Sequence, residues 1–207
     1  MRLAREGIPT IGTLLAVTAV GYVIYPAVSA ALLFPLALCV WFYRDPDRTP
    51  PLDSDGWVSP ADGRVVEVTD DSLDQYAGRT TKIGIFMNGL DVHVNRFPTD
   101  GEVEEIRYVP GKKWFAIEPK ASEANERMYV GIMTSKGRTT LVQVAGIMAR
   151  RIVCKINMGE TLARGERYGM IKLGSRVDIY LPNGVTPAVK PGDRVRAGES
   201  IIGVISG

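Results

Sequence analysis

An unbroken run of uncharged residues near the N-terminus constrains this chain more than any other feature. From Gly7 to Tyr43 the sequence contains no Asp, Glu, Lys or Arg. A helix crosses the hydrocarbon core of a bilayer, about 30 Å thick, in about 20 residues. The run is therefore too long for one spanning helix and barely long enough for two. Pro26 and its neighbours mark a turn, which predicts two short helices over Ile8–Ile24 and Ala27–Tyr43.

Basic residues stand on both sides of this run. Arg2 and Arg5 precede it, and Arg44 and Arg48 follow it. Because basic flanks favour the cytoplasmic side, residues 1–43 are predicted to form a membrane-associated helical hairpin in the cell membrane. The rest of the chain would then lie on the cytoplasmic side. A buried core hairpin is the alternative, and whether the hairpin spans the bilayer or dips into one leaflet stays open.

The remainder of the chain has the pattern of a β-rich domain. Prolines and charges in residues 44–57 predict a linker without regular structure. From residue 58 onward, short β-branched runs are separated by Gly, Pro, Asn or Asp, which predicts a mainly β sandwich or barrel over residues 58–207. The strands are expected over Val65–Val68, Lys82–Phe86, Val103–Val109, Arg127–Ile132, Thr139–Val144 and Arg176–Leu181.

The end of the chain adds detail to this fold. Val189–Gly203 has turn glycines followed by a strand pattern, and it is similar to the hairpins of biotinyl/lipoyl-like barrels. Ser59–Val65 has the same turn-then-strand character. No Lys stands at a hairpin tip between methionines, so we do not expect a carrier domain.

Composition argues against several classes of function. The net charge is +2, from 25 basic and 23 acidic residues, so no global field favours a nucleic-acid partner. A single histidine and the absence of a Cys cluster argue against a metal site. Cys39 and Cys154 lie in unrelated settings, and we therefore expect two packed thiols rather than a disulfide.

The Gly174–Ser175 bond lies just before the expected strand Arg176–Leu181, and the side chain of Ser175 can attack it. The Ser hydroxyl adds to the preceding carbonyl, and Gly, lacking a Cβ, permits the strained backbone that this attack needs. Elimination from the resulting ester would leave a pyruvoyl group made from Ser175. Most Gly-Ser pairs are ordinary turns, so the interpretation depends on the rest of the chain.

Two other motifs stand at informative places. They are Ser59-Pro-Ala-Asp62-Gly63 and Asp91-Val-His93-Val-Asn-Arg96-Phe-Pro98. Together with Leu173-Gly174-Ser175, and in this order, they resemble the pyruvoyl-dependent phosphatidylserine decarboxylases, specifically the short, archaetidylserine-type branch. The likeness extends over nearly the whole chain through Tyr108–Gly111, Asn125–Arg127 and Arg150-Arg151.

The resemblance implies a membrane-bound carboxy-lyase of phospholipid biosynthesis, made as a zymogen. It would convert phosphatidylserine to phosphatidylethanolamine and CO2 through a Schiff base with a pyruvoyl group derived from Ser175. Autocatalytic cleavage between residues 174 and 175 would leave residues 1–174 and 175–207 as two associated chains. Diacyl and archaeol lipids share the reacting head group, so the choice between them stays open. Unpaired strand edges leave a homodimer open as well.

The resemblance also implies roles for individual residues. His93, the chain's single histidine, would be the base that deprotonates Ser175 and the acid that protonates the carbanion. Asp62 would orient it or stabilise its cation, and Arg150 and Arg151 would bind the lipid phosphate.

Two positions depart from the longer relatives. Arg96 stands where those relatives have a second histidine, and Arg176 stands where they have a hydroxyl residue. Either His93 serves both self-cleavage and decarboxylation, or a different group covers one of the two steps.

Other interpretations of the same residues stay open. Asp62-Gly63 is also typical of a turn before a strand, and His93 of a hydrogen-bonded core residue. Arg150-Arg151 fits a solvated strand edge equally well. Two other functions remain: a non-enzymatic, membrane-tethered adaptor of the biotinyl/lipoyl kind, and a membrane protein that cleaves itself only for maturation.

Overall fold

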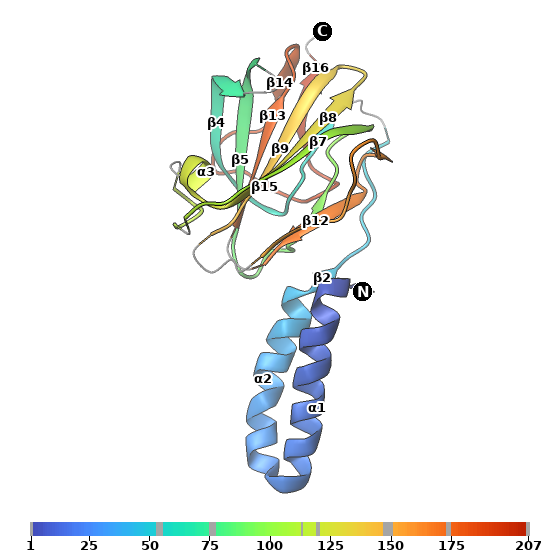
Figure 1. Cartoon of the computed structure of the whole chain (residues 1–207), viewed down its shortest axis with the longest axis vertical. Helices are drawn as coiled ribbons and strands as arrows, with labels where there is room; N and C mark the ends of the chain where they lie inside the picture. Colours follow the sequence, from blue (N-terminus) through green and yellow to red (C-terminus); the bar gives the residue numbers. More distant parts are fainter. Residues whose placement is uncertain are drawn as a thin grey trace. The chain divides into compact units, whose positions relative to one another are not determined.

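The computed structural model contains two compact units, Met1–Asp47 and Arg48–Gly207. Figure 1 shows them in sequence colours, the first in blue and the second from cyan to red. The structure describes residues 2–52, 56–74, 78–112, 114–118, 121–146, 151–172 and 175–205.

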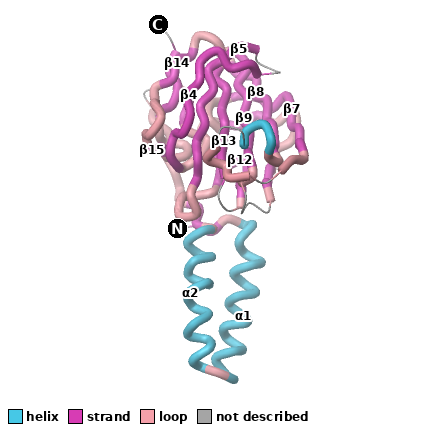
Figure 2. Tube along the Cα trace, turned by 90° about the vertical axis from the view of Figure 1, so that its left-hand side faces the viewer, coloured by secondary structure: helices cyan, strands magenta, loops and turns pink. Residues whose placement is uncertain are grey.

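The N-terminal unit is a helical hairpin. After a short 3-10 helix, Arg5–Gly7, helix α1 (Ile8–Ile24) and helix α2 (Pro26–Phe42) run side by side in opposite directions (Figures 1 and 2). Pro26 suits the first position of α2, because it has no N–H to leave unsatisfied there. The stretch Arg5–Ile24 is long and apolar enough to cross a membrane, whereas α2 is slightly shorter.

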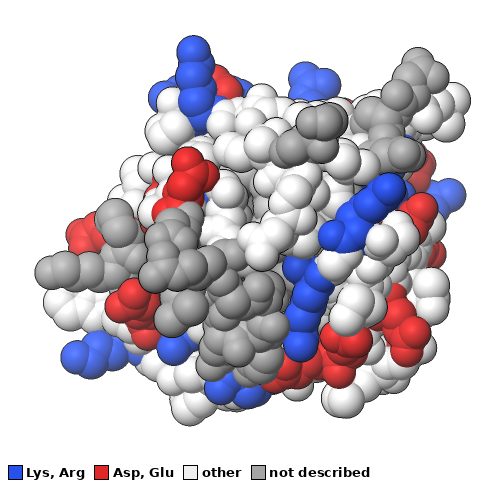
Figure 3. Space-filling view, turned by 90° about the horizontal axis from the view of Figure 1, so that it is seen from above, with Lys and Arg blue, Asp and Glu red and all other residues white. Residues whose placement is uncertain are grey.

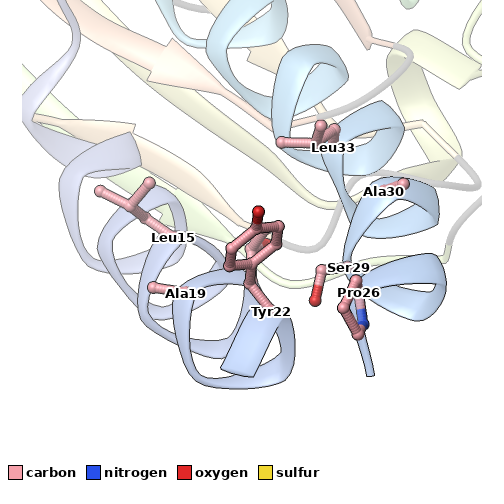
Figure 4. A pocket seen from close by; sticks show the side chains of 8 residues that line it. Leu15, Ala19, Tyr22, Pro26, Ser29, Ala30 and Leu33 are labelled. Atoms are coloured by element: carbon pink, nitrogen blue, oxygen red, sulfur yellow. The ribbon is translucent and has the colours of Figure 1, made fainter. Parts of the chain in front are cut away.

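Close packing between these helices depends on small and hydroxyl side chains. A Cβ on Gly21 would come within 2.9 Å of the Ser29 hydroxyl. The Thr18 hydroxyl donates to the Leu14 carbonyl at 2.7 Å, so it is satisfied within its own helix. Figure 4 shows the apolar pocket between the helices, which is lined by Leu15, Thr18, Ala19, Tyr22, Pro26, Ser29, Ala30 and Leu33.

The segment after the hairpin is more regular than the sequence suggests. Strand β2 (Arg44–Asp45) pairs antiparallel with strand β1 (Arg2–Leu3), so the expected linker begins with a short strand. Farther along, the Arg164 guanidinium donates to the carbonyls of Pro51 and Gly56. These two contacts tie Pro51 and Gly56 to Arg164 within the β-rich unit.

The β-rich unit is built around one antiparallel eight-stranded sheet. The curled sheet is visible in Figures 1 and 2. All six strands expected from the sequence are present in it, and the mainly β prediction is confirmed. Its order is β11 (Thr161–Leu162), β7 (Gly101–Val109), β8 (Arg127–Thr134), β9 (Gly137–Val144), β13 (Ser175–Leu181), β5 (Gly78–Met87), β4 (Gly63–Asp74) and β15 (Arg194–Val195).

Two three-stranded sheets and a short helix complete this unit. The first sheet has the order β10 (Ile152–Cys154), β12 (Arg167–Ile171) and β6 (Val94–Arg96). The second has the order β14 (Val185–Pro187), β16 (Ile201–Ile205) and β3 (Trp57–Val58). Helix α3 spans only Ala121–Ala124.

The expected C-terminal hairpin is not one hairpin. Gly192 and Gly198 have positive φ angles of +101° and +75°, as the predicted turns need. However, β15 pairs with β4 in the large sheet, whereas β16 pairs with β14 and β3. The two turns therefore carry the chain from one sheet to another.

The hydrophobic core lies on the inner face of the large sheet. Along β13, the side chains of Val177, Ile179 and Leu181 are all fully buried in it. Trp57 is also fully buried, and its indole N–H donates to the Thr139 hydroxyl at 2.9 Å. A buried indole needs such a partner, so this bond joins the small sheet of β3 to β9.

Candidate active site

Ser175 is the first residue of β13, in the middle of the large sheet. It pairs with Met87 of β5, and its side chain is on the same face as Val177, toward the core. The side chain is fully buried, and its hydroxyl makes no hydrogen bond to any residue that the structure describes. Such a group calls for an explanation, and reactivity is one. Leu173 and Gly174 lie outside the described residues.

His93 is fully buried in the segment leading into β6. Its Nδ1 lies 2.9 Å from the carbonyl oxygen of Asp91. A carbonyl can only accept, so Nδ1 carries the proton and Nε2 is the basic nitrogen. The backbone oxygen of His93 in turn accepts from Ile171, at the end of β12, at 3.4 Å. Ser175 follows Ile171 by four positions along the chain.

A polar contact chain also connects the His93 segment to the strand beside Ser175. Asn95, two residues after His93, donates to the sulfur of Met87 at 3.7 Å. Gln143 of β9 donates to the Asn95 side-chain oxygen at 2.8 Å. Both amides are fully buried, so they fix β6 against β5 and β9. The sequence predicts no role for Asn95 or Gln143, although a Gln within the apolar strand Thr139–Val144 is a usable signal.

Asp62 is buried directly before β4, and both of its carboxylate oxygens are engaged. One carboxylate oxygen accepts from the Ala197 amide at 2.7 Å, and the other lies 3.0 Å from Arg48 Nη2. Arg48 also pairs with Glu199 at 2.8 Å. These contacts fix the position of the carboxylate. The segment of Asp62 lies beside that of His93, because the Arg96 amide donates to the Pro60 carbonyl at 2.9 Å.

Arg96, at the position of the relatives' second histidine, is buried as well. Its Nη1 donates to the Gly165 carbonyl at 2.8 Å. A Cβ on Gly198 would come within 2.9 Å of Arg96 Cδ, so the turn glycine makes room for this side chain. Arg96 therefore joins three loops at the edge of the site.

Arg150 and Arg151 are the two residues predicted to bind the lipid phosphate. Arg150 lies outside the described residues. Arg151 has an exposed side chain, and its backbone oxygen accepts from the Lys172 amide at 3.1 Å. Arg151 thus lies near the chain segment that leads to Ser175.

Arg176 extends to the opposite face of the sheet from Ser175, where it is fully buried. Its guanidinium binds both Asp178 and Glu67. Burial alone lowers the pKa of Arg176, but the nearby charge of Asp178 and the hydrogen bonds to Glu67 and Asp178 outweigh it, so the net shift is upward. From the sequence, Arg176 was identified only as a difference from the residue type expected after the cleavage-site serine. Gly84 in the middle of a strand was the signal for a close approach.

The Glu67 carboxylate gives this cluster a testable pH dependence. Burial raises its pKa, but the hydrogen bond and charge of Arg176 and the charge of Lys82 hold it below the ordinary value of 4.5. Such a carboxylate stabilises the fold above its unfolded-state pKa, and the effect is lost as pH falls through the lower, folded-state pKa. We expect the free energies of unfolding of wild type and Glu67→Gln, from urea titrations, to differ most above pH 4.5 and to converge in acid. A gap that widens on acidification would contradict this assignment.

The family model and the similar proteins described next all point to one family. The family model for phosphatidylserine decarboxylase matches residues 36–203. The phosphatidylserine decarboxylase proenzyme of Solidesulfovibrio magneticus is 45% identical over 203 residues, covering 97% of this chain and 94% of that protein. The proenzyme of Nitratidesulfovibrio vulgaris is 46% identical over 203 residues, covering 97% and 93%. That of Ralstonia nicotianae is 44% identical over 206 residues, covering 97% and 94%.

The chain belongs to the phosphatidylserine decarboxylase family. The resemblance noted from three short motifs is thereby confirmed. The family match includes Asp62, His93 and Ser175, and the fold brings the segments that carry them together. The similarity also argues against the non-enzymatic adaptor, because the relatives are named as proenzymes of a decarboxylase.

Proposed function

We propose that this member of the family is a membrane-bound lyase that converts phosphatidylserine to phosphatidylethanolamine and CO2. The observation that carries the proposal is Ser175: a fully buried hydroxyl without a hydrogen bond to any described residue, at the first position of a central strand. The family's proenzyme names support a precursor that must be processed. Archaetidylserine, with the same head group, is the second candidate substrate.

Self-cleavage would use the residues of this chain alone. Ser175 Oγ attacks the carbonyl carbon of Gly174 while His93 Nε2 takes the hydroxyl proton, and the Gly174–Ser175 amide becomes an ester. Loss of the Ser175 α-proton then breaks the ester Cβ–O bond, which frees the Gly174 carboxylate and leaves a dehydroalanine. Addition of water and loss of ammonia convert this end into a pyruvoyl group. Residues 1–174 and 175–207 would stay associated through the pairing of β13 with β5 and β9.

The surroundings of Ser175 suit a pyruvoyl group. The position is buried, and it has apolar neighbours in Met87 and Val177. A pyruvoyl group supplies an electron sink for the bonding pair that the departing carboxylate leaves behind. His93 Nε2 would deliver a proton to the substrate carbon that loses CO2, and Asp62 would stabilise the charged imidazole.

The lipid would be held by charges and by the membrane. We assign its phosphate to Arg150 and Arg151, since a guanidinium matches the geometry of a phosphate. The exposed side chain of Arg151 near the segment before Ser175 supports this assignment. On the face drawn in Figure 3, Lys and Arg are mixed with Asp and Glu.

The membrane anchor, the small C-terminal sheet and the oligomeric state complete the proposed architecture. The hairpin of residues 1–43 would anchor the enzyme in the cell membrane, with residues 58–207 as the catalytic domain on the cytoplasmic side. The apolar stretch Arg5–Ile24 supports the anchor. The separate sheet of β14, β16 and β3 would be the biotinyl/lipoyl-like part of the fold. A homodimer through sheet edges would complete the assembly.

The proposal is tested by incubating the purified full chain with phosphatidylserine labelled at the serine carboxyl carbon, in detergent micelles. We expect labelled CO2 and phosphatidylethanolamine in equal amounts. Prior reduction with borohydride, which converts the ketone to an alcohol, is expected to stop the reaction. If a cleaved protein released no CO2 from any serine phospholipid, the cut would serve maturation only.

A further inference from the structure

An arginine on the outer face of the large sheet is held across three strands. Asp178 of β13 pairs with Gly84 of β5, and Gly84 pairs with Glu67 of β4, so these three residues form one row. The Arg176 guanidinium lies over Gly84 and binds the two acids at the ends of the row. A Cβ on Gly84 would come within 2.1 Å of Arg176 Nη2. The missing Cβ of Gly84 therefore makes room for the guanidinium in this position.

The backbone is adjusted to complete this cluster. The register of β4 against β5 shifts between Val65 and Glu67, and this irregularity turns Glu67 to the outer face although Val65, two residues earlier, faces the core. Lys82 Nζ lies 3.3 Å from Glu67 and 3.9 Å from Asp178. Two cations thus balance two anions, as charges that are largely removed from water require.

A similar arrangement occurs among the described strands, although its arginine is partly exposed and Thr140, rather than a second acid, completes the row. Arg138 of β9 pairs with Glu105 of β7 at 3.1 Å, and a Cβ on Gly131 of β8 would come within 2.7 Å of Arg138 Nη2. The register of β7 also shifts, between Val103 and Glu105. This second clamp ties strands that no proposed cut interrupts. It serves as a matched control for the first.

Cleavage would turn the start of β13 into a free chain end. Ser175 and Arg176 would become the first residues of a new chain, and strand ends open more easily than strand centres. Conversion of Ser175 also removes its N–H, a donor to the backbone ladder. Arg176 is the first residue paired on both sides, with Phe86 of β5 and Val144 of β9. Its side-chain bonds reach one strand farther, to β4.

We propose that Arg176 is a positioning residue: clamped by Glu67 and Asp178, it anchors the chain end that self-cleavage creates and so keeps the pyruvoyl group in the active site. This inference rests on the proposed cleavage at Ser175. It explains why a fully buried charge stands directly after the reacting residue. The anchor matters after cleavage, because in the intact chain the preceding residues also hold the strand.

The test compares full-length Arg176→Met with the matched control Arg138→Met. For each protein, intact mass gives the cleaved fraction, steady-state assays give kcat and KM per cleaved molecule, and amide hydrogen exchange reports on residues 176–178. We expect Arg176→Met to lower kcat by roughly a hundredfold with little change in KM, the size expected for a misplaced reacting group. Exchange at residues 176–178 should rise by roughly tenfold, because bonds to charged groups are lost. Arg138→Met should change neither.

Two further comparisons separate anchoring from general stability. In the uncleaved Ser175→Ala background, Arg176→Met should raise exchange at residues 176–178 much less than it does in the cleaved protein. Arg176→Lys, which keeps the charge but not the two-pronged geometry, should restore part of kcat. If Arg176→Met does not accumulate, Glu67→Gln, which loosens the clamp from the neighbouring strand, should give the same pattern with smaller changes.

The outcomes distinguish this inference from the proposed function. An uncut wild-type chain would refute cleavage itself, and the anchor with it. A cleaved wild type together with an Arg176→Met variant whose kcat and exchange match those of Arg138→Met would overturn only the anchor. Equal exchange effects in the cleaved and uncleaved backgrounds would also overturn it, because Arg176 would then be a structural residue alone.

Discussion

Ser175→Ala is expected to yield one uncut chain of 207 residues with no lyase activity. Alanine has no hydroxyl to attack the Gly174 carbonyl, so neither the ester nor the pyruvoyl group can form. Without the electron sink, decarboxylation should fall toward the uncatalysed rate, a loss of roughly a millionfold or more. Denaturing gel electrophoresis and CO2 release from labelled phosphatidylserine measure the two effects.

A matched control is available for this variant. Ser122 in α3 is also buried, and its hydroxyl makes no hydrogen bond to a described residue. Ser122→Ala should be cut and should decarboxylate at the wild-type rate. Residual cutting of Ser175→Ala at the same bond, or lyase activity in the uncut protein, would refute Ser175 as the precursor of the cofactor.

His93→Ala should slow the appearance of the two chains by roughly a hundredfold to ten-thousandfold, the usual contribution of a general base. The reason is geometric: Nδ1 is engaged by the Asp91 carbonyl, which leaves Nε2 as the basic atom. A time course of intact mass after synthesis measures the rate. Because His93 is the single histidine of the chain, no second imidazole can replace it.

The same variant decides whether one imidazole serves both reactions. After long incubation, the cleaved fraction of His93→Ala can be assayed for CO2 release per cleaved molecule. A low rate there would assign His93 to decarboxylation as well. Asp62→Asn should slow cleavage less than His93→Ala, since in the proposed mechanism Asp62 only orients the imidazole or stabilises its charge. Cleavage of His93→Ala at the wild-type rate would show that the base assignment is wrong.

Much of the fold follows from the sequence for simple physical reasons. The two helices of the hairpin were placed to within one residue, because a charge-free run interrupted by Pro26 leaves few other solutions. The strands around Val65 and Ile179 were found because β-branched side chains alternate between glycines and prolines. Sheet membership was not accessible in this way. The residues of Val189–Gly203 specify their turns, but β15 and β16 find partners far away in the chain.

The site was predictable only where single residue types carry the chemistry. Ser175 and His93 are conspicuous in the sequence because few other residues could act as the nucleophile and the general base of self-cleavage. Asn95 and Gln143 did not, because their hydrogen bond joins positions 48 residues apart. The Arg176 clamp depends on a strand irregularity at Glu67 and on the missing Cβ of Gly84. Neither feature can be interpreted until the pairing of the strands is known.

Intact mass spectrometry of the purified full-length protein shows whether Ser175 becomes a pyruvoyl group. We expect two chains, and the smaller consists of the 33 residues from Ser175 to Gly207. Its mass should be lower than that of the plain peptide by the mass of one ammonia, and its blocked N-terminus should react with a carbonyl reagent. A single chain of 207 residues that persists in active buffer would contradict the account, as would a 33-residue chain with an ordinary serine at its N-terminus.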